Sequence, residues 1–152
     1  MSHDRRLSLQ LWIVLNRAVD AMDRPLRRQV EGHGLSMKAF AVLEVLASKG
    51  PLPIGDVAEK VLLTSGSMTY VIDQLEDDGL LERRRCPDDR RVCYVALTDA
   101  GQDRVDAIFP EHAALIQRLM RGLSVEEKET AYHLLRRLSQ TAPEQAPSSS
   151  TP

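Results

Sequence analysis

The chain has 152 residues, of which 43% are hydrophobic and 28% charged, and its formal net charge is −2. This length suits one domain with a hydrophobic core. The apolar runs are far shorter than the roughly 20 residues that span a bilayer, so no segment is expected to cross a membrane and no membrane partner is expected. The two cysteines and the absence of a secretion signal predict a cytoplasmic protein, and no second Cys or His pair offers a metal site.

The first long segment, residues 7–31, is predicted to form a helix. Apolar residues recur every three or four positions from Leu11 to Val30, which gives a narrow stripe close to that of a coiled coil. Pro25 lies inside this segment and is expected to kink or interrupt the helix.

Three shorter helices are expected next. Ser36 caps a helix that reaches about residue 48, and Pro53 suits the first turn of a third, short helix. Thr64 is a good N-cap for a fourth helix, and Gly79 is expected to end it.

Residues 80–97 change to an alternating pattern that predicts a β-hairpin. Strands at about 80–85 and 92–97 flank a charged, turn-forming tip.

Two more helices and a tail complete the chain. Thr98 begins a fifth helix to about residue 121, with a bend expected at Pro110. Ser124 and Glu127 form a capping box for a sixth helix. Residues 141–152, rich in Pro and Ser, are expected to be a disordered tail.

The order of short helix, helix and hairpin predicts a winged helix-turn-helix over residues 35–97, whose second helix enters the major groove of DNA. The first half of that helix is small and hydrogen-bonding, which suits phosphates and base edges. Its second half carries Asp73, Glu76, Asp77 and Asp78, which phosphates would repel. Only the first two turns are therefore expected to enter the groove, unless the helix merely presents a solvated face.

Arginines gather on the hairpin, with Arg83, Arg84 and Arg85 on one strand and Arg90 and Arg91 at the tip. Arginine inserts well into a narrow minor groove. Asp89 can accept from a neighbouring arginine and fix the tip. Two alternatives stay open: a strand edge protected by charge, or a winged-helix module used for protein contact.

The terminal segments, residues 7–34 and 98–140, frame the central region and predict a helical dimerisation region. They could instead pack as a small bundle within one chain. A two-fold dimer would set two recognition helices about one DNA turn, near 34 Å, apart, and this spacing matches a palindromic operator.

The run from Leu63 to Leu80 resembles the recognition helix and wing entry of the MarR family of transcription regulators. Asp89-Arg90-Arg91, followed by Leu97-Thr98-Asp99-Ala100-Gly101, resembles the wing of that family. The resemblance covers about residues 8–140 and implies a mainly α fold with a small β-hairpin wing, in a homodimer.

The resemblance also implies roles for single residues and a mode of control. Arg91 would enter the minor groove and Asp89 would steady the wing. A repressor released by a small aromatic or phenolic compound, or by an oxidant, is implied. An enzyme is not expected, because the sequence has no phosphate-binding Gly-rich loop and no His-x-x-x-His or Cys-x-x-Cys site, and no cofactor is expected. The residues that match major-groove contacts are Ser65, Ser67, Thr69 and Tyr70, and Arg84 and Arg90 of the hairpin are further candidates for DNA binding.

A ligand pocket would lie between the dimerisation helices and the DNA-binding region. The alternative places Trp12 and Phe40 in the core and His33 on the surface. A redox switch through Cys86 and Cys93 ranks below ligand binding, because redox sensors of the family commonly carry their cysteine on the first helix, which has none here. The candidate pocket residues are Trp12, Asn16, His33, Met37 and Phe40.

Overall fold

The computed structural model describes residues 1–61, 65–86, 88–89 and 91–145, without the side chains of residues 65 and 143–145. The chain divides into two compact units, residues 1–116 and 117–152. No described helix is long and apolar enough to cross a membrane. The elements run in the order α1 (His3–Glu31), α2 (Met37–Lys49), β1 (Leu52–Pro53), α3 (Ile54–Val61), α4 (Ser65–Asp77), β2 (Leu81–Arg85), β3 (Cys93–Leu97), α5 (Asp99–Leu119) and α6 (Val125–Gln145).

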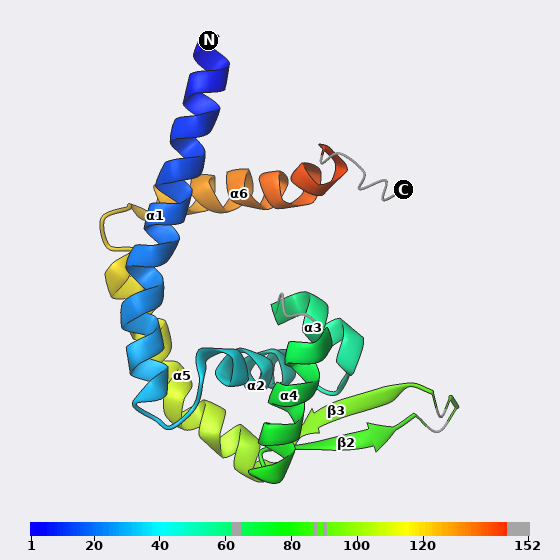
Figure 1. Cartoon of the computed structure of the whole chain (residues 1–152). Helices are drawn as coiled ribbons and strands as arrows, with labels where there is room; N and C mark the ends of the chain where they lie inside the picture. Colours follow the sequence, from blue (N-terminus) through cyan, green and yellow to red (C-terminus); the bar gives the residue numbers. More distant parts are fainter. Residues whose placement is uncertain (62–64, 87, 90, 146–152) are drawn as a thin grey trace. The chain divides into compact units, whose positions relative to one another are not determined.

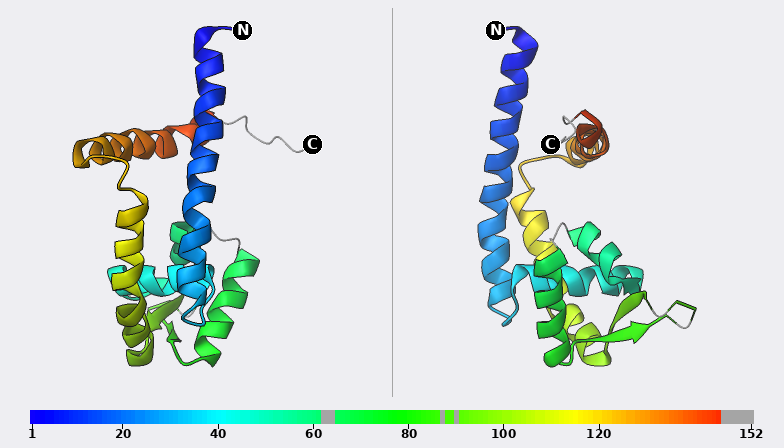
Figure 2. Two further views of the ribbon diagram at one scale, coloured as in Figure 1. Left: turned by 90° about the vertical axis from the view of Figure 1, so that its left-hand side faces the viewer. Right: turned by 45° about the vertical axis from the view of Figure 1, so that its right-hand side comes forward.

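Within the first unit, α2, α3 and α4 pack together, and the hairpin of β2 and β3 extends from beside α4 as a wing (Figure 1). The C-terminal end of α1 lies beside α5 (Figure 2), since Arg104 Nη2 donates to the carbonyl oxygen of His33 at 2.6 Å. The core of this unit is built from apolar side chains of the helices and the sheet, among them Phe40, Leu43, Met68, Ile72, Leu75, Leu81, Val95 and Ile108. The predicted winged helix-turn-helix is confirmed.

The wing contains a short strand that the sequence pattern did not reveal. The antiparallel sheet has the order β1-β3-β2, with Leu52 opposite Val95 and Pro53 opposite Tyr94. The prediction that Pro53 opens the third helix is therefore wrong, because α3 begins at Ile54. A proline is tolerated here because β1 is an edge strand.

Most predicted helix ends are confirmed. The Ser36 hydroxyl accepts from the backbone N–H of Ala39 at 3.1 Å, and Gly79 has a φ of 72° at the end of α4. Ser124 and Glu127 bond reciprocally, at 2.7 and 3.2 Å, as a capping box requires. The N-cap predicted at Thr64 lies outside the described residues.

Three expectations about the terminal helices need correction. Helix α1 begins at His3 rather than residue 7, because Ser2 provides an N-cap by accepting from Arg5 N. The same helix continues through Pro25, so an interruption there is wrong. Helix α6 extends to Gln145, so a disordered tail from residue 141 is wrong for residues 141–145; residues 146–152 lie outside the described part.

Candidate nucleic-acid interface

The first half of α4 presents hydrogen-bonding side chains outward. Met68, Val71, Ile72 and Leu75 are buried, as the helical period predicts. Thr69 is exposed on the other side, Ser67 is half-buried, and the backbone of Ser65 begins the helix. The same side is open at Gly66, where an added Cβ would meet nothing within 4 Å. A groove edge can therefore approach the backbone here closely.

Tyr70 is the most prominent side chain of this outer face, with 64% of its surface exposed. Gln74, one turn later, donates from Nε2 to the Tyr70 hydroxyl at 3.0 Å. Because the hydroxyl accepts from Gln74, its own hydrogen can point to an acceptor outside the helix. Phosphate oxygens and the major-groove acceptors of the bases are such partners.

The wing tip holds one arginine in a fixed, exposed arrangement. Asp89 Oδ1 accepts from the backbone N–H of Arg91 at 3.0 Å and from its Nε at 3.2 Å. The Arg91 side chain remains 91% exposed, so its terminal nitrogens face solvent. An exposed arginine whose orientation is fixed by a neighbouring carboxylate is suited to insertion into a narrow minor groove. Arg90 lies outside the described residues.

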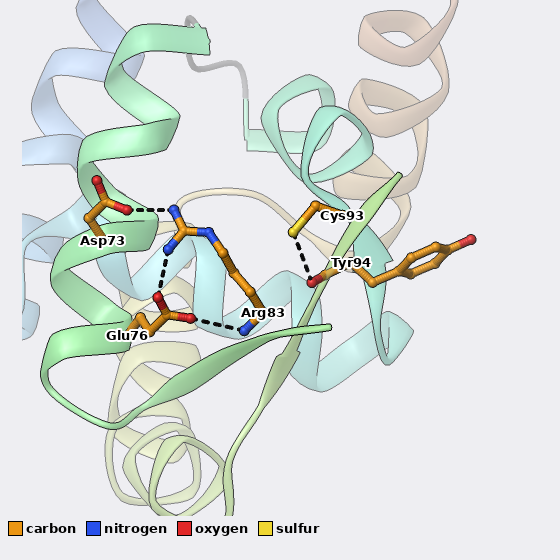
Figure 3. Close-up of polar contacts among 5 residues, drawn as sticks. All are labelled: Asp73, Glu76, Arg83, Cys93 and Tyr94. Carbon is orange, nitrogen blue, oxygen red and sulfur yellow. Dashed lines mark hydrogen bonds and ion pairs between the residues drawn. The ribbon is translucent and has the colours of Figure 1, made fainter. Parts of the chain in front are cut away.

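Arg83 has a different environment from the other wing arginines. Its Nη2 donates to Asp73 Oδ1 at 2.5 Å and its Nη1 to Glu76 Oε1 at 2.7 Å, while Glu76 Oε2 accepts from the Arg83 backbone N–H at 3.0 Å (Figure 3). The hydrogen bond to Asp73, together with the weaker effect of the hydrogen bond to Glu76 and the attraction of both carboxylates, raises the pKa of Arg83 against the opposing effect of burial. We call these three residues the wing clamp.

Two of the three carboxylates of α4, those of Asp73 and Glu76, are therefore paired within the protein. Arg83 offsets part of the negative charge of Asp73 and Glu76, a pairing that the sequence pattern did not indicate, whereas Asp77 and Asp78 are exposed. Arg84 is half-exposed and donates to Glu82 on the same strand at 2.6 and 2.8 Å. The exposed pair of Arg84 and Glu82 can open at little cost when a phosphate approaches.

Among the described residues, none of the predicted ligand-pocket residues lines the groove between α2 and α5 that is described below. Phe40 is 1% exposed and belongs to the core, which agrees with the alternative prediction for this residue. Trp12 is 66% exposed on α1, so the alternative prediction of a core position for Trp12 is wrong. Asn16 donates to the Trp12 carbonyl oxygen at 2.7 Å. His33 and Met37 are half-buried, and His33 faces Glu111 at 3.4 Å.

A groove of about 510 Å³ lies instead between the C-terminal half of α2 and α5. Its polar groups include the carboxylates of Glu44 and Asp106, and Phe109 is 44% exposed. No positional signal in the sequence predicted this groove, since its two walls are about 60 residues apart in the chain. The lining residues are Glu44, Ala47, Ser48, Gln102, Val105, Asp106, Phe109 and Pro110.

A buried histidine links three helices near this groove. His112 of α5 is 6% exposed, its Nδ1 lies 2.9 Å from Oε1 of Gln29 on α1, and its ring packs edge-on against Phe40 of α2 at 5.0 Å. Desolvation lowers the pKa of His112, although the charge of Glu44 opposes this effect. The neutral imidazole therefore belongs to the folded state.

Both cysteines are free thiols and half-buried. The strand register sets Cys93 opposite Arg85, and the backbone N–H of Cys86 bonds to the carbonyl oxygen of Val92. Because side chains alternate between the faces of a hairpin, Cys86 and Cys93 point to opposite faces. The Sγ of Cys93 lies 3.7 Å from the Tyr94 carbonyl oxygen (Figure 3). A Cys86–Cys93 disulfide would require the hairpin to rearrange.

Among the described residues, no group of three His, Cys, Asp or Glu side chains is arranged to hold a metal ion.

Comparison with known proteins identifies the family. The model of the MarR family matches residues 35–93. The HTH-type transcriptional regulator MhqR of Bacillus subtilis is 42% identical over 135 residues, which cover 89% of this chain and 93% of that protein. The chain belongs to the MarR family. It is therefore related to DNA-binding transcription regulators and not to enzymes.

Solved structures agree with this assignment. BpsR of Bordetella bronchiseptica, whose DNA binding is regulated by 6-hydroxynicotinic acid, is 27% identical with a TM-score of 0.77, over 86% of this chain and 98% of that one. The MarR family regulator Sco3205 of Streptomyces coelicolor, solved in complex with DNA, has a TM-score of 0.81 at 21% identity, over 92% of this chain and 88% of that one. The fold of this MarR family member is thus that of a winged-helix regulator.

Proposed function

We propose that this MarR family member is a homodimeric repressor that acts in the bacterial cytoplasm and binds a palindromic operator. In this proposal the first two turns of α4 read the major groove through Ser65, Ser67, Thr69 and Tyr70, and Arg91 enters the minor groove. The single observation that carries it is the exposed, Asp89-held Arg91 on a wing whose strand β2 packs beside α4, the helix whose first turns carry Ser67, Thr69 and Tyr70. Arg84 and Arg90 add phosphate contacts.

The homodimer is supported by apolar surface that one chain leaves uncovered. In the N-terminal half of α1, apolar side chains lie on nearly every side of the helix, and Leu7, Leu9, Leu11, Trp12, Ile13, Val14 and Val19 are each 48–66% exposed. A helix that is apolar on most sides requires burial on most sides. Helix α6 likewise exposes Tyr132, Leu134, Leu135 and Leu138. A second copy offers partners of the same length and chemistry.

The effector is proposed to be a small aromatic compound bearing a hydroxyl group, bound in the groove between α2 and α5. Phe109 and Pro110 offer apolar contact, and Glu44 or Asp106 can accept from a phenolic hydroxyl. The lining contains no Lys or Arg, so an aromatic carboxylate would meet repulsion. The regulation of BpsR by 6-hydroxynicotinic acid, which carries both a hydroxyl and a carboxylate, supports control by an aromatic hydroxyl compound in a related protein. The acidic lining of the groove in this chain favours an effector without the carboxylate. The alternative, a redox switch through Cys86 and Cys93, is less favoured because a disulfide between them would require the hairpin to rearrange.

The experiment that tests the proposal begins by selecting duplexes from a random-sequence pool with the purified protein. We expect a palindromic sequence, bound with an affinity that falls steeply as salt rises, because phosphate contacts release counterions. Phenol and benzoate are then added in parallel at equal concentration, with Phe109→Ala as the groove variant. Release by phenol that weakens in the variant supports the effector site; selection of no sequence would contradict the DNA-binding role.

A further inference from the structure

The wing clamp joins the two elements that would contact DNA. Arg83 is the central residue of β2, and its guanidinium turns toward α4 instead of the wing tip (Figure 3). Both terminal nitrogens are engaged, one with Asp73 and the other with Glu76. The carboxylate of Glu76 also accepts from the Arg83 main chain, so side chain and backbone are held together.

Exposure separates Arg83 from its neighbours on the wing. The Arg83 side chain is 30% exposed, against 54% for Arg84 and 91% for Arg91. A charged hydrogen bond that is partly withdrawn from water is stronger than an exposed ion pair, and a two-pronged arginine contact also fixes direction. Arg83 therefore has the contacts of a structural brace, although in sequence it is one of five similar arginines.

We propose that Arg83 is a positioning residue that holds the wing at a fixed angle to the recognition helix, so that Arg91 reaches the minor groove while α4 occupies the major groove. This rests on the DNA-binding mode proposed above. Arg83 lies opposite Val95, which is fully buried, so the clamp acts where the hairpin leaves the core. A small rotation at that root is amplified along the strands to the tip.

The clamp has a second effect, on charge. Asp73 and Glu76 lie on the half of α4 that follows the DNA-reading turns, and the Arg83 guanidinium neutralises part of their charge. Without the guanidinium, the negative charges of Asp73 and Glu76 would add in full to those of Asp77 and Asp78 next to the DNA-reading turns. The clamp therefore both orients the wing and lowers the repulsion that α4 would meet.

The test is a double-mutant cycle for DNA binding. The affinity for a duplex selected by the wild-type protein is measured for Arg83→Gln, for Arg91→Ala and for the two changes combined. If Arg83 positions the wing, Arg83→Gln weakens binding about tenfold or more, and adding Arg91→Ala weakens it by less than twofold further, because Arg91 has already lost its place. Independent, multiplicative effects would overturn the proposal and make Arg83 a direct DNA contact, and wild-type affinity in Arg83→Gln would also overturn it.

A triple variant separates orientation from charge. Arg83→Gln combined with Asp73→Asn and Glu76→Gln removes the clamp together with its negative charges. Affinity that stays low supports wing positioning, whereas affinity that returns to the wild-type value would overturn it in favour of charge neutralisation alone.

Further variants guard against loss of folding. If Arg83→Gln does not fold, Glu76→Gln weakens the same contacts from the helix side and enters the cycle with Arg91→Ala, with the same non-additivity expected. Arg83→Lys keeps the charge but cannot make the forked contact, so an intermediate loss is expected. Failure of the wild-type protein to select any duplex would reject the proposed function itself, which is a different outcome from additivity in the cycle.

Discussion

Gly101 packs against the backbone carbonyl of Leu80, so closely that a Cβ on Gly101 would overlap the carbonyl oxygen and also lie 3.2 Å from Leu97 Cδ2. Thr98 completes the junction, since its hydroxyl donates to the Gly79 carbonyl oxygen at 2.6 Å and accepts from Gly101 N at 3.1 Å. The start of α5 is thereby fixed to the turn between α4 and β2. The Leu-Thr-x-x-Gly spacing of the wing has its physical reason in this contact.

The substitution Gly101→Ala is expected to destabilise the fold by about 3 kcal/mol, the upper end of the usual cost of overpacking, because backbone must move to admit the methyl group. Urea unfolding at a fixed protein concentration measures the free energy. Gly55→Ala is the control, since Gly55 lies inside α3 with nothing within 4 Å of the added Cβ, and it is expected to stabilise by about 0.5–1 kcal/mol. Equal stability of the two variants would contradict the packing argument.

Removal of the exposed wing arginine is expected to change the salt dependence of DNA binding. Arg91→Ala should weaken binding by about 1–3 kcal/mol and lower the salt slope by about 1, since one cationic contact disappears. Fluorescence anisotropy at several salt concentrations measures both quantities. Arg121→Ala, an exposed arginine between α5 and α6, is the matched control. A loss of affinity with an unchanged slope in Arg91→Ala would show that Arg91 does not meet phosphate or a charged groove.

Folding stability is expected to fall on mild acidification because of His112. Its pKa in the folded protein is lowered below the ordinary value of about 6.5, so the unfolded chain binds the proton more readily. The contribution of neutral His112 to folding stability is therefore full above about pH 6.5, the ordinary value. This contribution is lost as the pH falls toward the lower pKa of His112 in the folded protein.

The variant His112→Gln should flatten this part of the stability profile, as measured by urea unfolding between pH 5 and pH 8, while keeping a polar partner for Gln29. His3→Gln, which removes an exposed histidine, serves as the control. A profile for His112→Gln that still falls as steeply as the wild type would assign the effect to other groups.

The apolar face of α1 is expected to hold two copies together. Leu11→Glu places a charge on a surface that the proposed dimer buries, so the population should shift toward monomer in sedimentation velocity at micromolar concentration. Gln10→Glu introduces the same charge at an adjacent exposed polar position and is expected to leave the dimer intact. A dimer that survives Leu11→Glu would place the contact between copies elsewhere.

Local patterns were sufficient wherever the interaction partners are near in sequence. The period of Met68, Ile72 and Leu75 identifies the buried face of α4, because side chains three or four residues apart share one side of a helix. The capping box of Ser124 and Glu127 is local for the same reason, as is the contact of Asp89 with Arg91. The winged helix-turn-helix and the exposed face of α4 could therefore be predicted from the sequence.

Only the tertiary structure distinguished the contacts of the wing arginines from one another. Five arginines within nine residues have the same local chemistry, and Arg83 differs from Arg91 because strand β2 passes beside Asp73 and Glu76 of α4. Pro53 lies in a strand because it pairs with Tyr94, which is about 40 residues away in the sequence. The groove between α2 and α5 likewise joins segments that are far apart in the sequence. Sequence determined the periodic faces and caps of this protein, since those interactions are short in range. The wing clamp, the groove and the buried position of His112 became evident only from the tertiary structure, because each depends on side chains that meet only when elements distant in sequence pack together.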